Sequence, residues 1–155
     1  MTPALNCLKK QKISHKIYKY QHEPTTQAYG LEAVEKLNID QELVFKTLVV
    51  MLDNHELAVA IIPVAQKLSF KRIAKALGAK KSSMADKDSV VRSSGYVLGG
   101  VSPLGQKKAL RTVIDLSAQT LAIMLVSAGK RGLEIELAPT DLARLTRANF
   151  AEICL

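Results

Sequence analysis

Two apolar runs joined by a short polar turn constrain the fold of this chain more than any other feature. Residues 44–52 and 57–64 are almost entirely apolar, and Asp53, Asn54 and His55 lie between them. This arrangement is typical of a β-hairpin. Because both faces of each run are largely apolar, we expect the two strands to lie centrally in a sheet that is covered on both sides.

Helix and strand signals surround this hairpin in an irregular order. Helix starts are predicted at Thr2-Pro3, Ser69, Asp86 and Pro139, and helical spacing also follows Gly30. Further strands are predicted at residues 16–20, 111–116, 121–126 and 133–137. We therefore predict an α+β fold with about five helices and a mixed, mostly antiparallel, six-stranded barrel-like sheet. The pattern argues against a doubly wound parallel sheet.

The size and charge of the chain limit the number of domains and the classes of partner to be expected. Its 155 residues, 48% of them hydrophobic, are sufficient for one domain with a real core, so we expect residues 1–155 to form a single domain. Lysine and arginine number 22 against 14 acidic residues, which gives a formal charge of +8. Such a field favours association with polyanions such as nucleic acid, although the same lysines could simply coat a soluble surface.

The cysteines and the first residues indicate a reducing compartment. Cys7 and Cys154 lie near opposite ends of the chain, a spacing that suggests neither a disulfide framework nor a zinc knuckle. The start of the chain lacks the basic and apolar segments of a signal peptide. The longest apolar run, residues 57–65, is too short to span a bilayer and contains Pro63. We expect a cytoplasmic protein.

Lys46 is the most informative single residue. In an extended strand it shares one face with Val44, Leu48 and Val50, where an ammonium group is costly unless it reaches water or an anion. One interpretation is a strand-end lysine that extends to the surface. The other is that Lys46 lies at the opening of a pocket and meets an anionic or carbonyl ligand.

The glycine-rich segment Gly99–Lys108 is suited to close contact between backbone and ligand. It resembles a P-loop in the spacing of Gly100 and Gly105, but Gln106 and Lys107 follow where nucleotide hydrolysis needs Gly-Lys-Ser/Thr. What remains is a loop that directs backbone N–H groups at an oxyanion, or else a structural turn. Residues 127–132, with two glycines and a basic pair, leave the same two alternatives open.

Side chains suited to nucleophilic or metal chemistry are scarce. Cys7 is expected in the core, and Cys154 lies at the end of the chain. The three histidines are far apart, and the sequence contains no Gly-x-Ser-x-Gly elbow. We therefore expect neither a metal nor a cofactor, and no enzymatic nucleophile.

Several ordered segments together closely resemble the YbaK family of Cys-tRNA(Pro) deacylases. These proteins are freestanding relatives of the editing domain inserted in bacterial prolyl-tRNA synthetases. The resemblance covers essentially the whole chain and lies in Met1-Thr2-Pro3-Ala4, Phe45-Lys46-Thr47-Leu48, Ala74-Lys75-Ala76-Leu77-Gly78, Met84-Ala85-Asp86, Gly95-Tyr96, Gly99–Lys108 and Gly129-Lys130-Arg131-Gly132-Leu133. The family's mixed, barrel-like sheet agrees with the strand pattern.

The resemblance also implies a set of site residues. Lys46 matches the family's key lysine near the aminoacyl end of the substrate, and Gly99 and Gly100 match the glycines that line the site. The implied substrate-binding residues are Tyr20, Tyr29, Thr47, Ser127 and Glu134. Tyr29 replaces the usual phenylalanine, and Glu134 falls where relatives carry aspartate. Ser127 matches the serine that opens the last loop.

The implied activity is trans-editing, in which cysteine is hydrolysed from mischarged tRNA(Pro). In the mechanism proposed for this family, the thiol of the bound cysteine attacks its own ester, which accounts for the missing nucleophile. The implied partners are tRNA(Pro) and, transiently, prolyl-tRNA synthetase, with no role for membrane or DNA. Two alternatives stay open: a deacylase for another aminoacyl group such as alanine, and a non-catalytic RNA-binding or synthetase-partner module.

Overall fold

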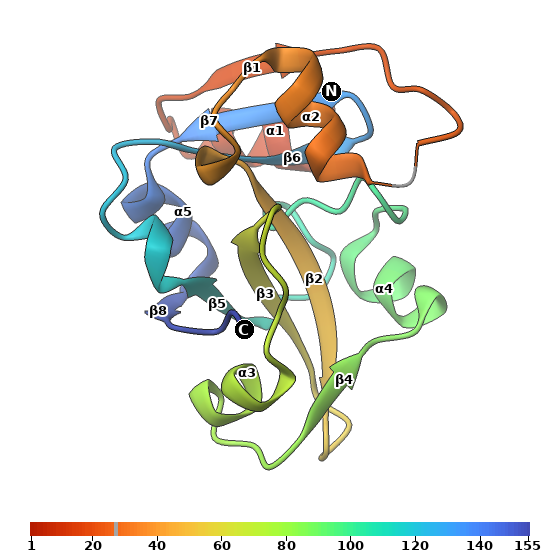
Figure 1. Cartoon of the computed structure of the whole chain (residues 1–155), viewed down its shortest axis with the longest axis vertical. Coiled ribbons are helices and arrows are strands. Elements are labelled where there is room, and N and C mark those ends of the chain that lie inside the picture. The colour runs from red at the N-terminus through yellow and green to blue at the C-terminus, as the bar shows by residue number, and fades with distance from the viewer. Residues whose placement is uncertain (27) are drawn as a thin grey trace.

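Two β-sheets with helices packed around them form the structure, a computed structural model that describes residues 1–26 and 28–155 (Figure 1). The larger sheet has the strand order β4-β2-β3-β5-β8, and the smaller has the order β1-β7-β6. The strands are β1 (Lys16–Lys19), β2 (Phe45–Leu52), β3 (Leu57–Pro63), β4 (Ser82–Met84), β5 (Arg111–Asp115), β6 (Met124–Lys130), β7 (Leu133–Leu137) and β8 (Asn149–Ala151).

The predicted hairpin is the centre of the larger sheet. β2 and β3 pair antiparallel from Phe45 with Pro63 to Met51 with Leu57. β5 then pairs parallel to β3, and β8 parallel to β5. The smaller sheet lies across the upper ends of β2 and β3 in Figure 1, and a parallel bridge between Val44 and Leu125 links the two sheets.

The predicted fold class is confirmed, whereas the strand count was too low. The mixed, mostly antiparallel arrangement is present, but the described residues form eight strands in two sheets. The two additional strands, β4 and β8, have three residues each. A segment such as Ser82–Met84 is too short and too polar to show an alternating pattern, because its pairing with β2 is decided by tertiary packing.

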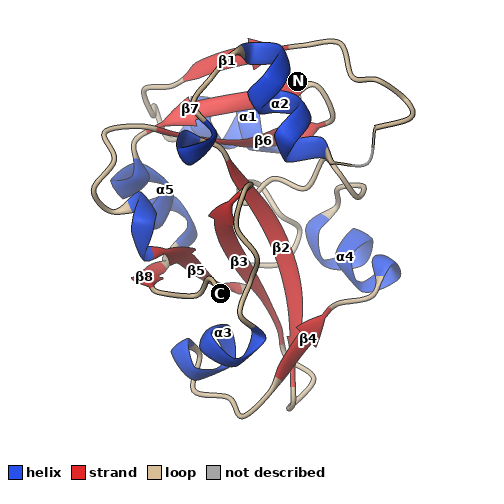
Figure 2. Cartoon of the chain, viewed as in Figure 1, coloured by secondary structure: helices blue, strands red, loops and turns tan. Residues whose placement is uncertain are grey.

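Side-chain caps begin α1, α3 and α4 where the sequence predicts them, whereas α2 and α5 begin without one. The helices are α1 (Pro3–Lys10), α2 (Tyr29–Leu37), α3 (Phe70–Ala76), α4 (Lys87–Ser94) and α5 (Pro139–Thr146), with short 3₁₀ turns at Gln41–Leu43 and Leu116–Ala118 (Figure 2). The Ser69 hydroxyl accepts the Arg72 amide at 3.1 Å, and the Asp86 carboxylate accepts the Ser89 amide at 3.1 Å. Thr2 caps α1 in the same way.

The strand β6 differs from its predicted position. The sequence predicted a strand at 121–126 and a loop at 127–132, but the strand continues to Lys130 and only Arg131 and Gly132 make the turn. The register shifts between Ser127 and Lys130, which marks a β-bulge. Gly129 has a φ of 101°, a conformation that favours glycine. Ser127 is therefore a strand residue and does not open a loop.

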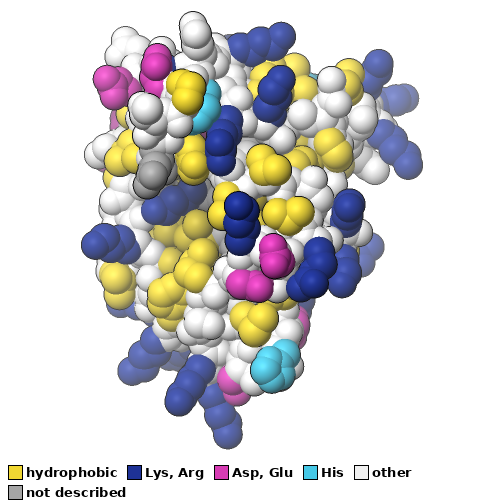
Figure 3. All heavy atoms as spheres, turned by 90° about the vertical axis from the view of Figure 1, so that its right-hand side faces the viewer, with side chains coloured by type: hydrophobic (Ala, Val, Ile, Leu, Met, Phe, Trp, Pro, Cys, Tyr) yellow, Lys and Arg dark blue, Asp and Glu magenta, His cyan; other side chains and the backbone are white. Residues whose placement is uncertain are grey.

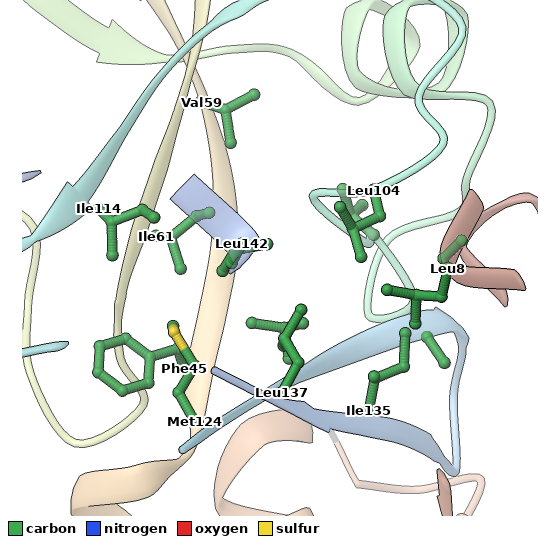
Figure 4. Close-up of a cluster of buried hydrophobic side chains, with 14 of the residues drawn as sticks. Leu8, Phe45, Val59, Ile61, Leu104, Ile114, Met124, Ile135, Leu137 and Leu142 are labelled. Carbon is green, nitrogen blue, oxygen red and sulfur yellow. The ribbon is translucent and has the colours of Figure 1, made fainter. Parts of the chain in front are cut away.

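The β2 side chains alternate between two hydrophobic cores, as its apolar faces predict. Phe45 and Val49 enter the larger core, while Val50 and Leu52 enter the second, beneath α3. Figure 4 shows Phe45, Ile61 and Met124 gathered in the larger core from β2, β3 and β6. Full burial of each such side chain contributes about 1.5–3 kcal/mol, so this core fixes how the two sheets meet.

No helix among the described residues has the length and apolarity needed to cross a bilayer.

Candidate active site

A cavity of about 350 Å³ opens where the two sheets meet, and residues from both sheets, from α2 and α4 and from the loop around Gly99 line it. We call it the main cavity. β2 contributes residues 45–49, and the start of α2 contributes residues 28–31. The other segments contribute Tyr20, Val64, Met84, Ala85, Val90, Leu98, Gly99, Val101, Ser127, Lys130, Arg131 and Glu134. Every predicted site residue except Gly100 lines this cavity.

Lys46 and Thr47 are neighbours on β2, so their side chains leave opposite faces of the strand, and both residues line the cavity. Lys46 is half-buried, and burial lowers the pKa of its ammonium group; the nearby Cys154 opposes this shift, and Lys67 adds to it. The Thr47 hydroxyl oxygen is buried, and within residues 1–26 and 28–155 it has no hydrogen-bond partner. An unsatisfied buried hydroxyl is costly, so a ligand oxygen or nitrogen would find a free partner here.

Glu134 is a buried carboxyl group in the cavity wall. It is 6% exposed, and burial raises its pKa to about 8. Its side chain forms no salt bridge or hydrogen bond with the described residues. Ser127 pairs with Glu134 across β6 and β7, so the two residues stand side by side. Burial and the nearby Glu134 raise the pKa of Tyr20 to about 12, which keeps its phenol protonated as a hydrogen-bond donor.

Tyr29, Gly99 and Arg131 meet at the edge of the cavity, and we call these three residues the cavity mouth. The Arg131 guanidinium lies over the Tyr29 ring, 4.6 Å from its centroid. Its Nε and Nη2 atoms both donate to the Leu98 carbonyl, at 3.0 and 2.6 Å. A cation–π contact combined with a forked hydrogen bond holds the guanidinium in one orientation.

Gly99 is required here for a reason that the sequence did not show. We expected Gly99 to bring bare backbone close to a ligand, but a Cβ at this position would lie 2.7 Å from both Arg131 Nε and Tyr29 Cε2. Its φ of 84° also favours glycine. The missing side chain thus makes room for the Tyr29–Arg131 pair.

Replacing Gly99 with alanine is expected to lower the free energy of unfolding by about 2–4 kcal/mol, through backbone strain and the steric conflict with Tyr29 and Arg131. Gly78→Ala is the matched control, because Gly78 has a similar φ of 73° and nothing within 4 Å of an added Cβ. We expect about 1 kcal/mol for this control, from strain alone. Urea unfolding measures both values, and equal losses would contradict the steric role of Gly99.

Gly100 is placed differently from the other predicted residues. It is buried outside the cavity lining, and its N–H donates to the Val97 carbonyl at 3.0 Å. A Cβ at Gly100 would lie 3.2 Å from Lys130 Cα, so this glycine lets the loop pack against the end of β6. By contrast, the Gly99 and Val101 amides have no hydrogen-bond partner among the described residues, and both residues line the cavity.

Sequence reasoning missed the apolar part of the cavity wall. Leu98, Val101, Met84 and Val90 come from the glycine-rich loop, β4 and α4, and nothing in their local patterns distinguishes them from core residues. Arg131 was noted as part of a basic pair and of the segment Gly129-Lys130-Arg131-Gly132-Leu133, but no role was predicted for its side chain. Its role at the mouth depends on Tyr29, which is distant in the sequence.

A second cavity, of about 470 Å³, is lined by Asp115, Ser117 and Cys154 among others. Burial and the nearby Asp115 raise the pKa of the Cys154 thiol to about 12, which leaves it protonated and weakly nucleophilic. Cys7 lies on α1 and lines neither cavity. The described residues contain no group of three acidic, histidine or cysteine side chains placed to hold a metal ion.

Comparisons with known proteins identify relatives of this chain. A protein of Enterococcus faecalis that bears the name Cys-tRNA(Pro)/Cys-tRNA(Cys) deacylase EbsC is 39% identical over 153 residues, which cover 98% of this chain and 92% of the relative. A crystal structure described as a trans-editing enzyme for prolyl-tRNA synthetase superposes with a TM-score of 0.85 at 18% identity, covering 100% of this chain and 99% of the other.

A hypothetical protein of known crystal structure gives a TM-score of 0.88 at 22% identity and covers 99% of this chain and 100% of its own. At such low identities these two structures show a shared fold alone. The sequence model of the aminoacyl-tRNA editing domain matches residues 22–145. Together with the 39% identical relative, this match shows that the chain belongs to the aminoacyl-tRNA editing domain family and confirms the YbaK-type resemblance of its motifs.

Proposed function

We propose that this protein is a trans-editing deacylase that hydrolyses the ester of Cys-tRNA(Pro) and releases cysteine and tRNA. Family membership and the name of the 39% identical relative support this assignment. The observation that carries it is the composition of the main cavity, which gathers Lys46, Glu134 and the unpaired amides of Gly99 and Val101. No cysteine or histidine lines it within residues 1–26 and 28–155. Such a site is suited to holding and polarising a substrate that brings its own nucleophile.

The substrate-assisted route uses the thiol of the bound cysteine. The sulfur attacks the ester carbonyl carbon, the bond to the ribose oxygen breaks, and that oxygen takes up a proton. The product is a cyclic thioester, which water then opens to free cysteine. No serine or threonine of the cavity needs to act as a nucleophile in this route, because the substrate thiol takes that role.

The predicted site residues have the following roles in this route. The Glu134 carboxylate pairs with the α-ammonium of the cysteine, and Lys46 polarises the aminoacyl end of the substrate. The amides of Gly99 and Val101 are available as donors to the developing oxyanion, whereas the Gly100 amide is already engaged. Tyr20 and Tyr29 form the walls, with Thr47 and Ser127 as polar contacts.

Positioning and electrostatics supply the rate enhancement that this route needs. Holding the thiol in attack geometry can contribute up to about 7–11 kcal/mol. One well-placed oxyanion donor adds about 3 kcal/mol. Together these effects are large enough for a fast reaction without a covalent enzyme intermediate.

Thiol assistance predicts that Cys-tRNA(Pro) is hydrolysed on the order of 100-fold faster than Ser-tRNA(Pro), because a hydroxyl is a much weaker nucleophile than a thiol. A matched substrate is S-methylcysteinyl-tRNA(Pro), which keeps the sulfur but blocks the attack, and it should resist hydrolysis. Release of the labelled amino acid measures all three rates. Equal rates for cysteine and serine would argue against thiol assistance.

The same assay separates the alternative functions. Faster hydrolysis of Ala-tRNA(Pro) would assign the protein to another aminoacyl group. Stoichiometric tRNA binding without turnover would make it a non-catalytic RNA-binding module. We further propose that residues 1–155 act as one editing domain in the cytoplasm, and that transient association with prolyl-tRNA synthetase supplies the selection of tRNA(Pro).

A further inference from the structure

Arg131 is held in a way that leaves part of its guanidinium free for a ligand. Its Nε and Nη2 atoms are fixed on the Leu98 carbonyl, and one face of the group covers the Tyr29 ring. The Nη1 atom has no hydrogen-bond partner among the described residues. The side chain is exposed and lines the main cavity. A fixed, exposed guanidinium with a free N–H edge is a ready-made site for an oxyanion.

The charge balance of the cavity favours an anion at this place. Among the described residues that line it, Lys46, Lys130 and Arg131 are basic, and Glu134 is the one acid. Arg131 forms no salt bridge with any carboxylate in the described part of the chain, unlike Arg72, Arg111 and Arg144. Its positive charge is therefore not neutralised by the protein itself.

Figure 3 shows the face that carries α4 and β4, where lysine and arginine side chains are scattered around exposed hydrophobic ones. Met84 and Leu98 are exposed hydrophobic residues that also line the cavity, at 48% and 40% exposure. The edge of the cavity is thus partly apolar and partly cationic. This combination suits a nucleotide, whose base is apolar on its faces and whose phosphate is anionic.

We propose that Arg131, assisted by Lys130, binds the 5′-phosphate of the 3′-terminal nucleotide of the tRNA. This proposal rests on the proposed function, because it assumes that the esterified amino acid occupies the cavity. The ester is attached to the terminal ribose, and the 5′-phosphate of that nucleotide is on the other side of the same ring. With the amino acid beside Lys46 and Glu134, the phosphate reaches the mouth, where Arg131 Nη1 can donate to it. Arg131 thereby sets how deeply the aminoacyl group enters.

The test measures what the phosphate adds to binding, independently of hydrolysis. The probes are two stable amides, 3′-cysteinylamido-3′-deoxyadenosine with and without a 5′-phosphate, titrated by calorimetry. For the wild-type protein we expect the phosphate to lower the Kd about tenfold, the effect of one charge-assisted contact. For Arg131→Gln the gain should fall to at most twofold, and Arg131→Lys should retain about threefold.

Arg92→Gln is the matched control, because it removes an exposed arginine of α4 that does not line the cavity. It should keep the full tenfold gain. A variant that merely loosened the mouth would weaken both probes equally and preserve the ratio, so a preserved ratio in Arg131→Gln overturns the proposal. The absence of a phosphate gain in the wild-type protein also overturns it. A normal gain without hydrolysis of Cys-tRNA(Pro) would leave the phosphate site standing and reject the proposed deacylase.

Discussion

Replacing Lys46 with methionine is expected to lower kcat for Cys-tRNA(Pro) by about 100- to 1000-fold, the cost of removing one electrostatic contact to a developing charge. Methionine keeps much of the length and packing of the lysine stem while it removes the ammonium. The fold should remain intact, because burial disfavours the charged form of Lys46 in the native state. Single-turnover deacylation measures the effect, and the melting temperature reports on the fold.

Lys67→Met is the matched control for this variant. Lys67 is exposed, lies close enough to Lys46 to lower its pKa, and does not line the main cavity. The Lys67→Met substitution removes one positive charge, as Lys46→Met does, but at a position outside the cavity. We therefore expect less than a threefold change in kcat from long-range electrostatics. Similar losses in both variants would indicate that the net charge, and not the position of Lys46, supports the reaction.

Glu134→Gln is expected to separate activity from stability. Loss of the carboxylate removes the partner of the substrate α-ammonium, so kcat/KM should fall about 10- to 100-fold, the loss that accompanies removal of a charged hydrogen bond. Since the Glu134 pKa is about 8, kcat/KM of the wild-type protein should rise with pH toward that value as the carboxylate forms. The variant should lack the part of this rise that comes from the Glu134 carboxylate and keep only the part that comes from ionisation of the substrate thiol.

The same substitution should stabilise the protein at high pH. The folded-state pKa of about 8 lies above the ordinary value of 4.5, so the native state holds one more proton than the unfolded chain between these two values. Stability from this group is therefore present below about pH 4.5 and is lost as the pH rises toward 8. Glutamine cannot ionise, and its advantage over glutamate should grow across this range to no more than about 5 kcal/mol.

Glu136→Gln is the control, because Glu136 is on the same strand, does not line the cavity and accepts a hydrogen bond from Tyr18. It should show neither the loss of activity nor the gain in stability with rising pH. Denaturant unfolding at pH 5 and at pH 8 measures the stability of all three proteins. A difference between wild type and Glu134→Gln that does not change with pH would contradict the burial of an unpaired carboxyl.

The parts of the fold that depend on local chemistry could be predicted from the sequence. The hairpin of β2 and β3 follows from two apolar runs and a polar turn, and the starts of α1, α3 and α4 follow from their capping residues. The bulge in β6 could not be predicted, because it depends on how the strand pairs with β7. The pairings of β4 and β8 are likewise set by distant neighbours.

The residues of the candidate site likewise fall into those that the local sequence could predict and those that depend on distant segments. Lys46 stands out because an ammonium group is costly on an apolar strand face, and Gly99, Gly100 and Ser127 lie in glycine-containing segments that the sequence marked as candidate ligand loops. Tyr20, Tyr29, Thr47 and Glu134 came only from the family resemblance. The purpose of Gly99 was inferred only in part, since the groups that need its space, Tyr29 and Arg131, belong to remote segments. The burial that raises the pKa of Glu134 could not be predicted either, because the alternating pattern of the five-residue strand β7 places Glu134 on its polar face.

The mouth formed by Tyr29, Gly99 and Arg131 joins three segments that are widely separated along the chain. Bringing these segments together costs the entropy of closing long loops, so the mouth depends on the rest of the fold being in place. A chain in which these three segments have not yet met therefore lacks the cavity mouth that would hold an ester in place. We therefore expect only the fully folded protein to hydrolyse the ester of a charged tRNA.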